Sequence, residues 1–168
     1  MPQVKTKVQV RQRRLFEEIE RYVYSDRFLN RMVYSPRKEI QMNHEELDLG
    51  ELWFESRFES GNLAEAFLAR DYEYDLYVEP DLFQDNHRQW FFFKVGNMRN
   101  DCTYTFNIVN FEKRDSQFGK GMQPVTFSMY EATQGHPIWK RAGTDIIYNR
   151  NNIKNRSNKA WFLIYPEQ

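Results

Sequence analysis

The pattern of hydrophobic and polar positions changes at about residue 50. Before it, a short amphipathic helix over roughly residues 10–24 is predicted by apolar residues that recur at helical spacing, namely Leu15, Phe16, Ile19, Tyr22 and Val23. Pro36 and the polar cluster at 43–46 then predict irregular chain up to about residue 50.

After residue 50 the apolar positions alternate, as they do in a strand with one face on a core and one in water. Residues 52–58 follow this pattern and stop at Ser60, after which Gly61 and Asn62 suit a turn with positive φ. The clearest case is residues 71–78, where acidic residues alternate with Tyr72, Tyr74, Leu76 and Val78. Each segment predicts a strand with one buried face.

The remaining chain predicts further strands and one long loop. Residues 89–95 contain four consecutive aromatic residues, Trp90 to Phe93, which predicts a strand buried on both faces. Strands are also predicted around residues 104–108, 125–130, 138–141, 145–148 and 161–165, and the charged, glycine-containing segment 112–124 is a long loop. Strands at intervals of about 8–12 residues favour an antiparallel sandwich or barrel. We predict an all-β fold, an antiparallel β-sandwich of about seven to nine strands with an N-terminal helical extension.

Composition narrows the function without identifying it. The chain has 168 residues, enough for one domain of ordinary size, and 17% of them are aromatic, as strands favour. Because 24 basic residues balance 24 acidic ones, a dedicated nucleic-acid binder is disfavoured. A single cysteine, Cys102, excludes an internal disulfide, and no run approaches the roughly 20 apolar residues of a membrane span. We therefore predict a protein of a reducing compartment that binds neither nucleic acid nor membrane.

Residue types that carry catalysis do not form a recognisable site in the sequence. The histidines at 44, 87 and 136 lack partners at metal-ligand spacing, and Cys102 has no histidine nearby in the sequence. Lys120 lies between two glycines but without the spacing of a phosphate-binding loop. Acidic residues between 71 and 85 could offer oxygens to calcium, although carboxylates on a strand face more often only meet water. We predict no catalytic residue, no metal ligand and no cofactor in this chain.

Five stretches in order resemble one known family. They are residues 54–63 (FESRFESGNL), 73–76, 89–93, 106–110 with 121–124, and 139–141 with Gly143 and Tyr148. Together they cover roughly residues 52–150 and are similar to the N-terminal domain of the cytosolic carboxypeptidases. Those enzymes are zinc metallocarboxypeptidases that remove glutamates from tubulin, and residues 78–83 look most like the branch that shortens long glutamate side chains.

The resemblance implies an antiparallel β-sandwich that stands directly before a catalytic domain, packs on it and helps to shape substrate access. The family's zinc signature, an H-x-x-E pair with a later histidine, is absent from this chain, so zinc is implied only for the parent enzyme. We divide the chain into a basic arm, helix and irregular segment at 1–51 and a β-sandwich at 52–168, before an absent catalytic domain. The implied substrate is tubulin or another glutamylated protein, and the implied location is the cytoplasm, with microtubules or cilia.

Two sets of residues are candidates for contact with a partner. A charged strand face, a turn and the long loop supply the candidate interdomain contacts Arg57, Glu59, Asn62, Ser116, Gln117 and Gln123. An alternative function is an independent binding module that docks on acidic partners such as tubulin tails through the basic arm Lys5, Lys7, Arg11, Arg13 and Arg14. A merely solvated arm would carry the same charge pattern.

Overall fold

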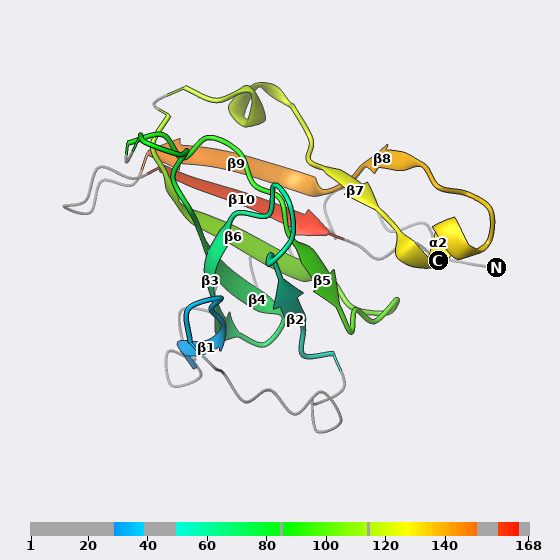
Figure 1. Ribbon diagram of the computed structural model, residues 1–168. Coiled ribbons are helices and arrows are strands. Elements are labelled where there is room, and N and C mark those ends of the chain that lie inside the picture. Colours follow the sequence, from blue (N-terminus) through cyan, green and yellow to red (C-terminus); the bar gives the residue numbers. More distant parts are fainter. Residues whose placement is uncertain (1–28, 39–49, 85, 114, 151–157, 165–168) are drawn as a thin grey trace, which may run out of the picture.

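The computed structural model describes residues 29–38, 50–84, 86–113, 115–150 and 158–164, and for residues 149, 150 and 158–164 it describes the backbone alone. The described chain is mainly β-strand, with two short helical turns (Figure 1). The elements are β1 (Arg31–Tyr34), β2 (Trp53–Glu55), β3 (Leu63–Arg70), β4 (Glu73–Val78), β5 (Lys94–Gly96), β6 (Tyr104–Phe111), η2 (Gln117–Lys120), β7 (Val125–Phe127), α2 (Met129–Thr133), β8 (Trp139–Arg141), β9 (Thr144–Arg150) and β10 (Asn158–Ile164). No helix among these elements is long and apolar enough to cross a membrane.

Six strands form the main sheet in the order β1-β3-β4-β6-β10-β9. All neighbours in it are antiparallel except β4 and β6, which run parallel with Glu73 opposite Thr105 and Leu76 opposite Ile108. A parallel pair needs a crossover connection, and residues 79–103 provide it. The all-β prediction is confirmed, with one parallel pair that hairpin-sized turns did not predict. The predicted helix at 10–24 lies outside the described residues.

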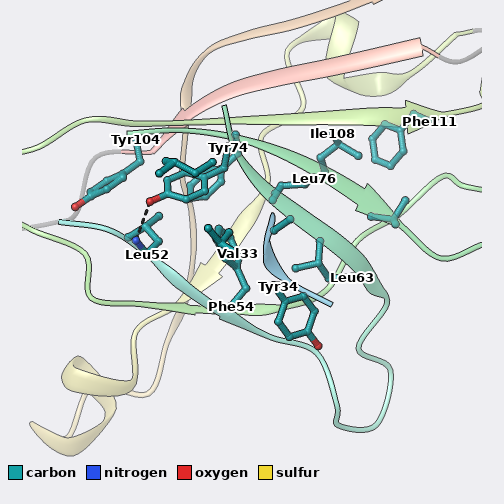
Figure 2. Close-up of a cluster of buried hydrophobic side chains, with 14 of the residues drawn as sticks. Val33, Tyr34, Leu52, Phe54, Leu63, Tyr74, Leu76, Tyr104, Ile108 and Phe111 are labelled. Atoms are coloured by element: carbon teal, nitrogen blue, oxygen red, sulfur yellow. Dashed lines mark hydrogen bonds between the residues drawn. The ribbon is translucent and has the colours of Figure 1, made fainter. Parts of the chain in front are cut away.

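A two-stranded ribbon of β2 and β5 covers one face of the main sheet (Figure 1). The ring of Phe54 lies 5.2 Å from that of Tyr74 and 6.2 Å from that of Phe106, so aromatic side chains join the two layers. Figure 2 shows the Tyr74 hydroxyl accepting a hydrogen bond of 2.8 Å from the Leu52 N–H. Both residues are fully buried, and burial raises the pKa of Tyr74 well above its ordinary value. The hydroxyl therefore stays protonated in the core.

Near β4 the alternating pattern holds only in part. Tyr74, Leu76 and Val78 are buried as predicted, but Tyr72 lies in the β3–β4 turn at φ +60° and is 37% exposed. Glu73, which we expected to face water, is buried, with its carboxylate bonded to Arg70 at 3.2 Å and to Asn107 at 3.0 Å. An amide and a guanidinium therefore replace the water that a solvated carboxylate would have.

Two strands arise where the sequence did not predict them. The sequence of β3, LAEAFLAR, has three Ala and one Glu, residue types that are depleted in strands, yet it pairs with both β1 and β4. β1 lies before residue 52, so the sheet itself reaches into the segment predicted to be irregular, while the division at residue 52 stays a prediction. Conversely, residues 125–130 form the strand β7 and then begin the helix α2.

Candidate docking surface

Residues 90–93 form an extended segment whose side chains alternate between the core and the surface. The rings of Phe91 and Phe93 pack inward, 6.1 Å from Phe111 and 6.4 Å from Phe106 respectively. Trp90 and Phe92 point the other way and are 43% and 37% exposed. The prediction of a strand buried on both faces is therefore wrong, because this segment has a core on one side only and its strand, β5, begins at Lys94.

Asn62 fixes the position of this extended segment. Its side-chain amide donates to the Trp90 carbonyl at 3.0 Å and accepts from the Phe92 N–H at 2.8 Å, while its own N–H donates to the Phe92 carbonyl at 3.0 Å. Asn62 is only 7% exposed, so these bonds form away from water. The buried Asn62 side chain thus bonds to the backbone of Trp90 and Phe92, as a neighbouring strand would, and holds this segment in place.

The β7–α2–β8 hairpin carries a second group of exposed apolar side chains and projects from the main sheet (Figure 1). None of the residues of α2 is buried, and the helix is held by its Ser128 cap, which accepts from the Glu131 N–H at 3.2 Å, and by a 2.7 Å ion pair between Lys140 and Glu131. Met129 is 68% exposed and Tyr130 75%. A hairpin with so few buried side chains gains little from a core of its own.

Ring contacts join the extended segment to the hairpin. Phe92 lies 5.2 Å from Phe58 and 6.0 Å from Trp139, and Trp139 lies 5.3 Å from Phe127. The Lys94 ammonium sits 4.9 Å above the Phe58 ring, where its charge is attracted to the ring face. We use the name apolar docking surface for the exposed residues of this region, which are Trp90, Phe92, Met129, Tyr130, Ile138 and Trp139.

The candidate contacts predicted on the first strand and turn lie in different settings. Arg57 is exposed and forms a bidentate pair with Glu55, with distances of 3.1 Å and 2.8 Å, and this hydrogen bonding lowers the pKa of Glu55 to about 2. Glu59 is exposed. Asn62 is buried beneath the apolar docking surface, and we place its role there as a positioning residue.

Positive φ in this turn occurs at Ser60, whose φ is +65°, and not at Gly61 or Asn62 as we expected. Gly61 is needed for a different reason. A Cβ atom on it would lie 2.1 Å from the Ser56 carbonyl oxygen, so only glycine lets the two backbones approach so closely.

The candidate contacts in the long loop serve its shape. Ser116 caps η2 by accepting from the Phe118 N–H at 3.3 Å, and Gln117 is exposed in the first position of that turn. Gln123 donates to the Gly143 carbonyl at 2.9 Å and so ties the loop to the β8–β9 connection. Whether these residues also contact another domain stays a prediction.

The acidic residues considered for calcium are dispersed or already bonded. Asp75 accepts from the Asn107 amide at 2.8 Å, Asp81 accepts from the Trp90 indole at 2.7 Å, and Asp71 is exposed. Across the part of the chain that the structure describes, no group of three or more His, Cys, Asp or Glu residues could hold a metal ion. Of the residues weighed for chemistry, His87 and His136 are exposed and Cys102 is half-buried; His44 lies outside the described residues.

Sequence reasoning missed most of the apolar docking surface. The sequence pattern predicts a strand for Ile138 and Trp139 and the end of another strand for Tyr130, and it does not indicate any of the three as a contact residue. One signal was available for α2, since Ser128 and Glu131 have the Ser-x-x-Glu spacing of a helix-capping box. For Trp90 and Phe92 no local signal separates the exposed rings from the buried ones.

The fold and these exposed residues define an all-β domain with apolar side chains exposed on its extended segment and on its hairpin. The family model for the cytosolic carboxypeptidase N-terminal domain matches residues 54–163, which confirms the resemblance. The chain belongs to this family of N-terminal domains.

Several proteins named cytosolic carboxypeptidase match a larger part of this chain than the family model does. Cytosolic carboxypeptidase 1 of Xenopus laevis is 40% identical over 148 residues, which are 88% of this chain and 12% of that protein. Cytosolic carboxypeptidase 4 of Homo sapiens is 40% identical over 159 residues, 95% of this chain and 14% of that protein. Cytosolic carboxypeptidase 2 of Mus musculus is 41% identical over 131 residues, 78% and 15% respectively. The chain thus matches between 12% and 15% of the length of these relatives.

Proposed function

We propose that this chain is the non-catalytic N-terminal domain of a cytosolic zinc metallocarboxypeptidase that removes glutamates from polyglutamylated tubulin. In this proposal the domain packs on the catalytic domain and shapes the access of substrate to it. The protein works in the cytoplasm, at microtubules or cilia, where its substrate is found. Zinc belongs to the catalytic domain, and no described residue of this chain is assigned to it.

The apolar docking surface is the observation that carries the packing proposal. Trp139 is 55% exposed and Ile138 56%, and both lie on a hairpin that projects from the sheet. Exposed apolar side chains on adjoining segments, here joined by the 6.0 Å ring contact of Phe92 with Trp139, are typical of a surface that another protein domain covers. Burying the exposed half of Trp139 alone would contribute about 2–3 kcal/mol, at about 25 cal/mol per Å² of apolar area.

The substrate part of the proposal rests on family membership. The matched relatives are named cytosolic carboxypeptidases, and the family resemblance implies glutamylated tubulin as their substrate.

The described basic residues do not support the alternative function, in which this chain binds acidic tails on its own. Eight of them pair with a carboxylate within 4.0 Å: Arg31, Arg37, Lys38, Arg57, Arg70, Arg88, Arg99 and Lys140. The basic arm at 5–14 lies outside the described residues.

The packing proposal is tested in the polypeptide that carries this domain together with a carboxypeptidase catalytic domain. Trp139→Ser should lower its thermal unfolding temperature and its release of glutamate from polyglutamylated tubulin. Ile138→Ser should act in the same direction, whereas Ile147→Ser, on the main sheet and 44% exposed, is the matched control and should do neither. Unchanged unfolding and activity in Trp139→Ser would overturn the packing proposal.

The substrate proposal has a separate test. The same polypeptide should release glutamate from polyglutamylated tubulin, lose this activity when zinc is removed by a chelator and regain it when zinc is restored. Absence of glutamate release from a folded, zinc-loaded protein would overturn the substrate assignment and leave the packing proposal standing.

A further inference from the structure

A tight turn at residues 81–84 holds two apolar side chains in water. Leu82 is 81% exposed and Phe83 94%, the highest values among the exposed large hydrophobic residues of the described chain. The turn is nevertheless well defined, because Asp81 and Gln84 pair as an isolated β-bridge and the Gln84 N–H donates to the Asp81 carbonyl at 3.0 Å. A second bond of 2.8 Å, from the Asp81 N–H to the His87 carbonyl, closes the base of the loop.

Phe83 occupies a backbone conformation that bulky residues rarely adopt. Its φ is +65°, in the left-handed region that favours glycine and, less strongly, asparagine. A phenylalanine there costs the domain conformational energy, and an almost fully exposed ring returns no packing within the domain. Neither the ring nor the strain therefore stabilises the fold that carries them.

The turn is attached to the apolar docking surface. The Trp90 indole N–H donates to the Asp81 side chain at 2.7 Å, and Asp81 directly precedes Leu82. The Trp90 carbonyl in turn accepts a hydrogen bond of 3.0 Å from the Asn62 side-chain amide. Hydrogen bonds thus tie the turn to Trp90, one residue of the apolar docking surface.

We propose that the Leu82–Phe83 turn is a preformed anchor that inserts into an apolar pocket of the catalytic domain. This inference rests on the proposed function and names a second point of contact for it. The relatives match this chain over only 12% to 15% of their length, so most of the polypeptide in those proteins lies outside the matched domain. Charge disfavours the acidic tubulin tail as the occupant, because the Asp81 carboxylate directly precedes Leu82 and would repel glutamates.

The proposal predicts opposite effects of one substitution on folding and on docking. Phe83→Gly relieves the left-handed strain, so the 168-residue chain should unfold at a higher temperature than the parent chain. The same change removes the anchoring ring. In the polypeptide with both domains it should therefore increase the rate of proteolytic separation of the domains at least ~10-fold, the effect of losing one interface hot spot.

A labelling experiment measures burial of the anchor directly. Phe83→Cys in a Cys102→Ser background should react rapidly with a maleimide in the 168-residue chain and at least ~10-fold more slowly in the polypeptide with both domains. Thr103→Cys, at an exposed position away from the turn, is the matched control and should react equally in both. Equal reactivity of the cysteine at position 83 in both proteins would overturn the anchor.

The outcomes separate this inference from the proposed function. If Trp139→Ser weakens packing while Phe83→Gly leaves it intact, the anchor is wrong and the docking surface stands. If neither change affects packing, both are wrong. A fall in the unfolding temperature of Phe83→Gly in the 168-residue chain would also overturn the anchor, because it would show that the ring stabilises its own domain.

Discussion

Replacing Asn62 with alanine should destabilise the domain far more than its position in a surface turn suggests. The side chain makes two hydrogen bonds, to the Trp90 carbonyl at 3.0 Å and from the Phe92 N–H at 2.8 Å. Alanine removes both and leaves a backbone donor and a backbone acceptor without partners where Asn62 is only 7% exposed. The backbone bond from the Asn62 N–H to the Phe92 carbonyl and the bond from the Trp90 indole to Asp81 are retained, so the segment stays attached.

The expected loss follows from these two bonds. Each net hydrogen bond contributes about 1 kcal/mol, and each polar group left unpaired away from water costs about 1–3 kcal/mol. Because the partners here are partly buried, we expect a total loss of about 2–4 kcal/mol in the free energy of unfolding. For a domain of this length that loss lowers the unfolding temperature by about 5–15 °C.

Urea unfolding followed by tryptophan fluorescence is the appropriate assay, since Trp90 belongs to the segment that Asn62 holds. Asn100→Ala changes an exposed asparagine in the turn before β6 and is the matched control, with an expected change within about 0.5 kcal/mol. A loss of free energy of unfolding below about 1 kcal/mol for Asn62→Ala, or an equal loss in the control, would refute the stabilising role of the two Asn62 side-chain bonds.

Three further predictions concern the fold around this surface. Gly61→Ala should lower the free energy of unfolding by more than about 3 kcal/mol in chemical denaturation, because the new Cβ would meet a backbone carbonyl. Gly119→Ala should be nearly neutral, because its new Cβ would have its closest atom, the Tyr148 Cβ, at 3.7 Å. Equal effects of the two changes would contradict the close approach at Gly61. Tyr74→Phe should cost about 1–3 kcal/mol in the same assay, since it leaves a buried backbone N–H without its 2.8 Å partner, and a neutral result would exclude that bond. The pKa of the Glu55 carboxyl, measured by NMR titration, should be about 2 and should move toward 4.5 in Arg57→Gln. Because folding lowers this pKa, the stability that Glu55 contributes is present above pH 4.5 and is lost as the pH falls toward 2. An unchanged titration in Arg57→Gln would argue against the ion pair.

Family membership and fold class could be predicted from the sequence, because both depend on patterns of residues that are close together along the chain. The alternation of Tyr74, Leu76 and Val78 gave a strand with one buried face, and these residues are core residues of the structure. The ordered stretches between residues 54 and 148 indicated the family whose model matches residues 54–163. Such signals survive without a structure because side-chain periodicity and short motifs depend on neighbours along the chain.

The pairing of strands could not be predicted in the same way. β3 has the composition of a helix as much as of a strand, and only its position between β1 and β4 makes it extended. The parallel pairing of β4 and β6 likewise depends on the crossover between them, a contact between segments about 30 residues apart along the chain. Long-range hydrogen bonding overrides local propensity at both places.

The sequence by itself determined that this chain is an all-β domain of the cytosolic carboxypeptidase N-terminal family without a local catalytic motif. Only the tertiary structure decided which aromatic residues face outward. Residues 90–93 are all aromatic, so the sequence does not separate the outward Trp90 and Phe92 from the inward Phe91 and Phe93. The Asn62 side chain, 28 and 30 residues away along the chain, bonds to the backbone of the outward pair. Exposure is a property of the packed layers, so the docking surface and its Phe83 turn appear only once the chain is folded.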